Sequence, residues 1–147
     1  MILAIDPGTT ESGVIEFDAG RVHASYIMPN EQVIQRIRWW TCPDLAIEMV
    51  ASYGMPVGAE VFDTVRWIGR FQQAFHLPDQ VRLIFRKDVK MHLCGSPRAK
   101  DGNIRQALID KLGPQGTKKN PGPTYGVKSH AWAALAVAVT ALEVPRA

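Results

Sequence analysis

The sequence predicts an α/β protein, in which helices cover a mixed β-sheet. Residues 2–28 contain apolar runs separated by short turns, as expected for strands joined into hairpins. The stretch 59–76 instead repeats apolar residues at helical spacing, namely Val61, Val65, Ile68, Phe71 and Phe75. Strands and helices then alternate along the chain, which favours helices packed on a sheet. We expect residues 1–147 to form a single domain, because this length suits one hydrophobic core and no linker interrupts it.

The expected order of elements is β-β-β-α-β-α-β-α-α-α. Asn30 and Ser129 are expected to cap the helices that follow them. The segment 113–126 is rich in Gly and Pro and is expected to be a loop or partly disordered. Strands are predicted at 2–6, 13–18, 21–28, 45–48 and 81–85, and helices at 31–40, 59–76, 87–93, 102–112 and 129–143.

The composition is that of an ordinary soluble protein, with 46% hydrophobic and 21% charged residues. No apolar run reaches the roughly 18 residues needed to cross a membrane. The N-terminal apolar run has no basic stretch before it, so we expect a cytoplasmic protein without a signal peptide. Cys42 and Cys94 have no metal-ligand spacing and are expected to be reduced thiols.

Positive charge is concentrated in one part of the chain. Residues 82–128 contain 11 Lys or Arg and 3 acidic residues, a balance of +8, whereas the remainder has 6 basic and 11 acidic residues. Such an asymmetry suits a protein that binds a polyanion with one surface and a cation with another. Two ordinary solvated surfaces would produce the same counts.

Two acidic residues each end a short apolar strand. Asp6 ends the first strand and enters an Asp-Pro-Gly-Thr-Thr turn, and Glu48 ends Leu-Ala-Ile-Glu. If these strands are neighbours, the two carboxylates converge. Because clustered carboxylates repel each other, a hard divalent cation such as Mg²⁺ or Mn²⁺ is the usual partner.

A third candidate lies at the start of the last helix. His130 precedes an Ala-rich stretch in which Ala131, Ala134 and Ala138 share one face, so this helix can lie close to the sheet. The helix dipole disfavours a protonated imidazole there, which leaves His130 available as a metal ligand or proton acceptor. Simple packing at a helix start is the alternative.

Together these motifs resemble the RuvC family of Holliday-junction resolvases, which belong to the RNase H-like superfamily. The resemblance rests on Ile-Asp6-Pro-Gly-Thr-Thr-Glu-Ser-Gly, on Ala-Ile-Glu48, on the helix from His130, and on the segment from Lys87 to Arg105, and it covers essentially the whole chain. The short chain is most similar to the phage-encoded branch.

The resemblance implies a three-layer fold with a central five-stranded sheet, and a homodimer. It also implies a crossover junction endodeoxyribonuclease that cleaves branched DNA with two Mg²⁺ or Mn²⁺ ions per active site. Asp6, Glu48 and His130 match the family's catalytic and metal-binding positions. Paired nicking of four-way junctions would leave a 5′ phosphate and a 3′ hydroxyl.

One position departs from the family pattern. Many members carry a further Asp one helical turn after the third site position, where this chain has Ala133. The chain could hold its ions with three side chains, bind one ion weakly, or recruit another acid such as Glu60 or Asp63. It could also be a disabled form that binds branched DNA without cutting it.

The basic segment supplies candidate DNA contacts. Lys100 best matches a family lysine near the active site, and Tyr53 could stack on a base near Ala51, the position where the family can place a wedging aromatic residue. The four tryptophans are expected in the core or in a dimer interface, for which the helix 59–76 is our candidate. The candidate phosphate contacts are Lys90, Arg98, Lys100, Arg105, Lys118, Lys119 and Lys128.

A third reading comes from the turn after Asp6. Asp-Pro-Gly-Thr-Thr is also similar to the phosphate loop of actin-like kinases and ATPases. Those enzymes need two such domains around a nucleotide, which 147 residues cannot supply.

Overall fold

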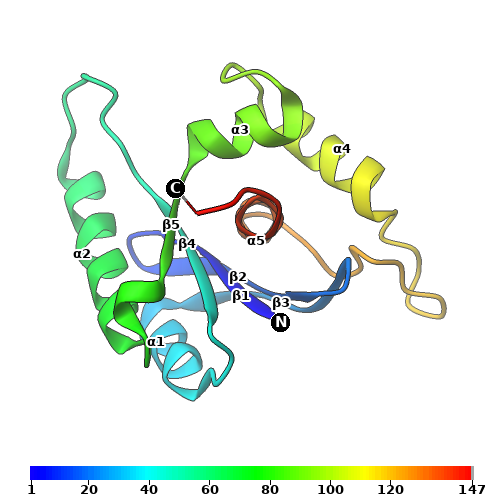
Figure 1. Cartoon of the computed structure of the whole chain (residues 1–147), viewed down its shortest axis with the longest axis horizontal. Helices are drawn as coiled ribbons and strands as arrows, with labels where there is room; N and C mark the ends of the chain where they lie inside the picture. The colour runs from blue at the N-terminus through cyan, green and yellow to red at the C-terminus, as the bar shows by residue number, and fades with distance from the viewer. Residues whose placement is uncertain (147) are drawn as a thin grey trace.

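The computed structural model describes residues 1–146, which form one five-stranded sheet with helices on both faces (Figure 1). The strand order across the sheet is β3-β2-β1-β4-β5. The first three strands are antiparallel neighbours, whereas β4 and β5 run parallel to β1. The predicted α/β class is therefore correct. The strands are β1 (Ile2–Asp6), β2 (Glu11–Asp18), β3 (Arg21–Pro29), β4 (Asp44–Met49) and β5 (Arg82–Phe85).

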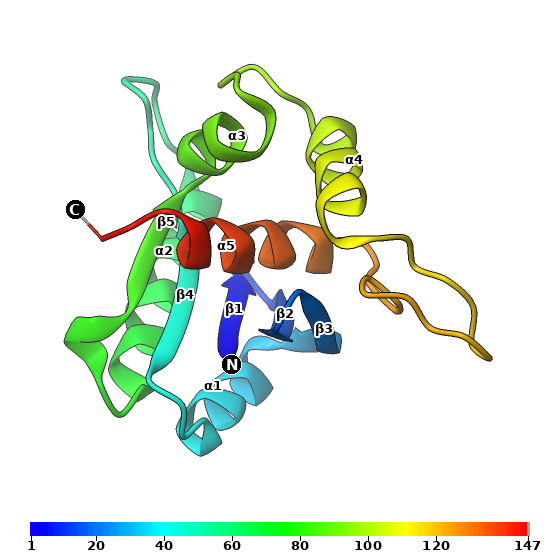
Figure 2. The same cartoon turned by 45° about the vertical axis from the view of Figure 1, so that its right-hand side comes forward.

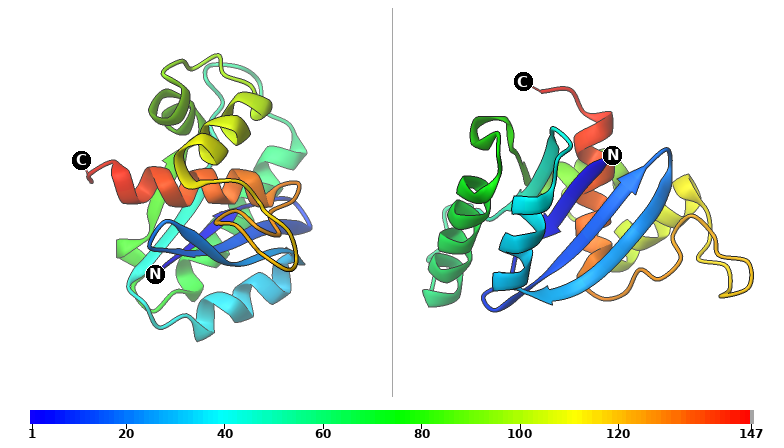
Figure 3. Two further views of the ribbon diagram at one scale, coloured as in Figure 1. Left: turned by 90° about the vertical axis from the view of Figure 1, so that its right-hand side faces the viewer. Right: turned by 90° about the horizontal axis from the view of Figure 1, so that it is seen from below.

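The helices form two layers on opposite sides of the sheet, as Figure 3 shows. One layer contains α1 (Asn30–Trp39) and α2 (Ala59–Ala74). The other contains α3 (Arg86–Cys94), α4 (Asp101–Leu112) and α5 (Ala131–Glu143). A short 3₁₀ turn at Pro78–Gln80 leads into β5. No helix of the described residues is long and apolar enough to span a membrane.

Alternate residues of β1 supply two separate cores. Leu3 and Ile5 pack in the cluster under α1 and α2, whereas Ile2 and Ala4 pack in the cluster under α5. Successive side chains of a strand point to opposite faces, so a strand covered on both sides reads as a continuous apolar run. The apolar start of the sequence is explained by this double burial.

Helix α5 lies directly on the sheet against β1 and β2, with α3 and α4 packed on its outer side (Figure 2). Its residues Ala131, Ala134 and Ala138 are buried, as the small-residue pattern predicted. The approach is closest at Gly13 of β2, where a Cβ atom would lie 2.5 Å from the carbonyl oxygen of His130. The start of α5 can reach β2 only because this residue is glycine.

Both predicted helix caps are wrong. Asn30 is the first residue of α1 and is fully buried, and its side chain makes no capping hydrogen bond. Ser129 lies outside α5 with φ of 49°, and His130 occupies the boundary position, also without a side-chain cap. Asn30 instead satisfies its buried amide through residues distant in sequence, a tertiary demand that a local pattern does not reveal.

The predicted apolar face of α2 is partly wrong. Ile68, Phe71 and Phe75 are buried as expected, but Val65 is exposed together with Phe62. The helix therefore presents apolar side chains on two faces, and only one of them packs on α1 and the sheet.

The segment between α4 and α5 is a loop, as predicted, and hydrogen bonds fold it into a compact arm. The Thr124 hydroxyl donates to the Gly113 carbonyl oxygen at 3.0 Å, and the Gly122 amide donates to the Gln115 carbonyl oxygen at 2.8 Å. The Val22 amide of β3 donates to the Pro123 carbonyl oxygen at 2.9 Å, which ties the arm to the edge of the sheet.

Candidate functional site

Asp6 and Glu48 lie side by side at one edge of the sheet. β1 and β4 are parallel, and Ile5 is directly opposite Ile47, so the next residues along both strands are neighbours. Each of the two acidic side chains is only 12% exposed. The structure thus brings together the two strand-end acids that the sequence singled out.

A buried hydrogen-bond network holds the turn after Asp6. The Asn30 side chain donates to the Gly8 carbonyl oxygen at 2.9 Å and accepts the Ser12 hydroxyl at 2.6 Å. The Gly8 amide in turn donates to the Ser12 hydroxyl oxygen at 3.2 Å. Since Ser12 and Asn30 are buried, this network gives the turn one conformation and determines how the chain leaves Asp6.

His130 is the third residue that the structure brings to this point. Asp6 is paired directly opposite Gly13 in the sheet, and α5 begins on Gly13. As a result, His130 Nδ1 lies 3.3 Å from Asp6 Oδ2. The imidazole remains 71% exposed, so it is open to a substrate.

Arg86 links Glu48 to a further acid, Asp101. Arg86 begins α3 directly after β5, the strand beside β4. Its guanidinium donates to Glu48 Oε1 at 3.0 Å and also to Asp101 Oδ1. The Arg86 side chain is 34% exposed and that of Asp101 is 83% exposed.

Sequence reasoning missed Arg86 and Asp101 as site residues. Arg86 carried a usable signal, because it follows a predicted strand directly and thus lies near the edge at which such strands end. Asp101 carried none, because only the packing of α4 beside α3 returns it to this edge.

Electrostatics at Asp6 favour a bound cation. Burial raises the pKa of Asp6 to about 8, the neighbouring Glu48 carboxylate adds to the effect, and Arg86 opposes it. Burial lowers the pKa of Arg86, but the carboxylates of Glu48 and Asp101 more than offset this and raise it above its usual value. Near neutral pH, Asp6 therefore keeps a proton unless another positive charge takes its place.

Four of these side chains, Asp6, Arg86, Asp101 and His130, line a cavity of about 460 Å³, and Glu48 is not among its lining residues. Ala133 lies in its wall, so the position at which the family resemblance implies a further acid carries only a methyl group. Glu60 and Asp63 do not compensate, because they are exposed on α2, on the other face of the sheet. The cavity residues with direct relevance are Asp6, Arg86, Asp101, Arg105, His130 and Ala133.

Among residues 1–146, no three His, Cys, Asp or Glu side chains are gathered closely enough to hold a metal ion as they stand. Asp6 contacts Glu48 and His130 separately, and Glu48 is also bonded to Arg86. The donor types nevertheless fit Mg²⁺ or Mn²⁺. Two carboxylates and an imidazole are oxygen and nitrogen ligands, and a cation would neutralise the negative charge of the buried carboxylates.

Three of the predicted DNA-binding residues lie next to the site. Arg105 lines the cavity, with its guanidinium 5.7 Å from the centre of the Trp132 ring. Lys100 directly precedes Asp101 at the start of α4. Lys128 lines an adjoining cavity of about 480 Å³ that also contains Tyr125.

The other candidates lie farther from Asp6. Lys118 and Lys119 form the tip of the arm, between Thr117 and Asn120, whose backbones exchange two hydrogen bonds of 3.1 Å. The arm projects from the body of the protein (Figure 2). The remaining candidates are Lys90 on α3, Arg98 before α4, and Tyr53, which is 61% exposed in the loop that contains Ala51.

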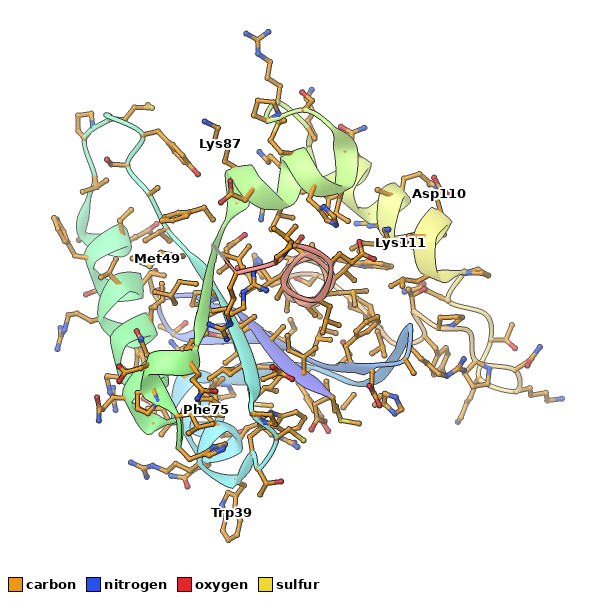
Figure 4. All side chains as sticks on the ribbon, in the orientation of Figure 1. Trp39, Met49, Phe75, Lys87, Asp110 and Lys111 are labelled. Atoms are coloured by element: carbon orange, nitrogen blue, oxygen red, sulfur yellow. The ribbon has the colours of Figure 1, made fainter. Side chains whose placement is uncertain are left out.

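The tryptophans behave differently from one another. Trp40 and Trp132 are buried, as expected for core residues. Trp39 is 81% exposed and points away from the body of the protein (Figure 4).

No family model and no curated protein matches this chain. The solved structures that are similar to it include two of RuvC. The Thermus thermophilus RuvC structure is 20% identical with a TM-score of 0.63, and the match covers 95% of this chain and 91% of that one. T. thermophilus RuvC in complex with a Holliday junction substrate is 21% identical with a TM-score of 0.65, and the match covers 95% of this chain and 90% of that one. This chain therefore has the RuvC-like, RNase H-like fold.

Proposed function

We propose that this protein is a metal-dependent endonuclease that resolves four-way junctions and other branched DNA by paired nicks. The observation that carries the proposal is the meeting of Asp6, Glu48 and His130 at one sheet edge, beside a segment with a charge balance of +8. The shared fold with T. thermophilus RuvC supports it, because that protein binds a Holliday junction.

Asp6, Glu48 and His130 are the residues that would hold Mg²⁺ or Mn²⁺. A divalent cation bound there would polarise the scissile phosphate and lower the pKa of an attacking water molecule. A neutral imidazole has a single free lone pair, so the exposed His130 ring would either bind the ion or accept a proton from that water, and not both. The products would carry a 5′ phosphate and a 3′ hydroxyl.

Branched DNA is the partner that the basic residues suit best. Lys100, Arg105 and Lys128 surround the site, so they would position the backbone of the strand to be cut. Lys118 and Lys119 would contact a duplex arm at a greater distance, together with Lys90 and Arg98. Tyr53 would stack on an unpaired base. We expect the protein to meet this DNA in the cytoplasm of a bacterial or phage-infected cell.

A homodimer would match the two-fold symmetry of a four-way junction with two active sites. Helix α2 is our candidate for its interface, because Phe62 is 60% exposed and Val65 is 38% exposed. A second copy of this helix would cover both side chains.

Cleavage of a synthetic four-way junction in Mg²⁺ or Mn²⁺ tests the proposal. We expect paired nicks from the unmodified protein, and a loss of cleavage with retained junction binding in Asp6→Asn. A linear duplex of equal length serves as the control substrate. Cleavage that survives Asp6→Asn would refute the proposed site.

The second candidate function is a branched-DNA-binding module without cleavage. Ala133 favours it, because this residue stands in the cavity wall where many family members carry an acid. Tight junction binding with no nicking in either metal would establish this alternative.

Tight binding of ATP, measured by calorimetry, would instead support the kinase-like reading of the turn after Asp6.

A further inference from the structure

Building on the proposed function, we propose that the guanidinium of Arg86 takes the place of a second divalent cation at the site. On this proposal each chain binds one Mg²⁺ or Mn²⁺, not the two that the family resemblance implies.

Negative charge is concentrated at this site. Asp6 and Asp101 line the cavity, and Glu48 is hydrogen-bonded to Asp6. Arg86 bonds to Glu48 at 3.0 Å and also to Asp101, and so supplies fixed positive charge to both. Asp6 forms no hydrogen bond with Arg86 among the described residues, so Asp6 and His130 are left to bind a metal ion. The second carboxylate oxygen of Glu48 could be a further ligand of that ion.

The cavity wall offers few ligands for a second metal ion. Such an ion would need a further carboxylate beyond the one, and the scissile phosphate, that two ions can share. Ala133 supplies none, and Asp101 is already bonded to Arg86. The side chains around the cavity therefore suit one metal ion and one guanidinium better than two metal ions.

The guanidinium group of Arg86 has the chemistry that this role requires. Arginine is charged at every relevant pH and carries five N–H donors in a planar fork. Two Arg86 nitrogens bond to carboxylates, so at least one N–H group on the fork is left over for a phosphate oxygen. The side chain is 34% exposed and lines the cavity, so DNA can reach it. Arginine and metal ions serve equivalent roles when they stabilise charge on a transferring phosphoryl group.

Counting bound Mn²⁺ tests the proposal directly. Free Mn²⁺ is measured by electron paramagnetic resonance during titration of the protein, alone and with a synthetic four-way junction. We expect one Mn²⁺ per chain in the junction complex and none in Asp6→Asn. Two ions per chain in the unmodified protein would overturn the inference.

Variants test whether Arg86 acts as a cation. We expect Arg86→Met to slow cleavage by about 10²- to 10³-fold. Junction affinity should change by only about threefold, because one phosphate contact is lost. The double variant Arg86→Met/Ala133→Asp should bind two Mn²⁺ ions and regain at least about tenfold in rate, since the added carboxylate provides a ligand for a second ion. Full activity of Arg86→Met, or no recovery in the double variant, would contradict the proposal.

Arg105→Met is the matched control. It removes an equal charge from the same cavity, but Arg105 forms no ion pair with these acids among the described residues. Its Mn²⁺ count should stay at one. Arg86→Lys keeps the charge and should retain more activity than Arg86→Met, which separates the loss of charge from a folding defect.

The outcomes distinguish this inference from the proposed function. Paired nicking with two bound ions overturns the inference and leaves the endonuclease proposal standing. Absence of both Mn²⁺ binding and nicking overturns both.

Discussion

At the scale of single residues, Asp6 is both a candidate metal ligand and a buried acid with a raised pKa. Its carboxyl group is 12% exposed and lies beside Glu48, and its pKa rises to about 8. A group with that pKa binds a proton in the folded protein over a range in which the unfolded chain has already released it. Stability should therefore depend on pH through this one residue.

The sign of that dependence is determined by linkage. Between the ordinary pKa of 3.8 and the folded value of about 8, the folded state holds more protons than the unfolded state. The free energy of unfolding should therefore fall as pH rises through this interval, by at most about 1.4 kcal/mol per pH unit for one group. Asp6→Asn should flatten the decline, because the amide does not titrate.

Urea unfolding at pH 5, 6.5 and 8 in the presence of a chelator measures this effect. Asp79→Asn, which alters an acid on the 3₁₀ turn far from the site, is the control and should keep the slope of the unmodified protein. Identical slopes in Asp6→Asn and the unmodified protein would show that Asp6 does not hold the proton.

At the scale of elements, the contact between α5 and β2 sets the geometry of the site. The start of α5 lies on Gly13, and Gly13 is paired with Asp6 in the sheet. His130 reaches Asp6 because helix and strand approach this closely. The absence of a Cβ atom at Gly13 therefore allows His130, a candidate catalytic residue, to lie beside Asp6.

Gly13→Ala should disturb both stability and the site. The new Cβ would lie 2.5 Å from the His130 carbonyl oxygen, so α5 must shift, at a cost of about 1–3 kcal/mol in the free energy of unfolding. Nicking should also decrease, because His130 moves away from Asp6. Urea unfolding and junction cleavage measure the two effects.

Gly102→Ala is the matched control for this substitution. A Cβ at Gly102, on α4, meets nothing within 4 Å, so the variant should be as stable as the original or more stable by up to about 1 kcal/mol. Equal stability of the two variants would argue against the close approach at Gly13.

The arm between α4 and α5 is the second element with a functional prediction. Replacing Lys118 and Lys119 by Gln should weaken junction binding and reduce the slope of log K against log salt by about 0.9 per lost contact. The double variant Arg38→Gln/Arg146→Gln removes the same charge from exposed positions on α1 and after α5 and should leave the slope unchanged. Fluorescence anisotropy at several salt concentrations measures the affinity of each variant and its salt dependence. If the arm variant has the same slope as the unmodified protein, the arm does not contact the DNA.

At the scale of the whole molecule, the exposed apolar side chains of α2 bear on assembly. We expect Phe62→Glu to convert a dimer to a monomer, because a charge cannot be buried in an apolar interface without a large desolvation cost. Light scattering coupled to gel filtration gives the mass. Trp39→Glu on α1 should leave the dimer intact, and dissociation by that variant instead would place the interface on α1.

The sequence by itself determined the class of fold and the order of the elements. Both follow from the local spacing of apolar residues, because helices and strands each bury residues at their own regular interval along the chain. The two strand-end acids could also be found, because strands that run parallel end at the same edge of a sheet. Asp6 and Glu48 could each be identified from the strand that precedes them, whereas the pairing of those two strands came from the structure.

Only the tertiary structure decided what surrounds these acids. Asn30 supports the turn after Asp6 and is not a helix cap, since its partners are Gly8 in that turn and Ser12 in β2. Asp101 reaches Arg86 because α4 packs beside α3, and His130 reaches Asp6 because α5 lies on Gly13. Each of these contacts joins residues far apart in the chain, and no local pattern records which distant segments will meet.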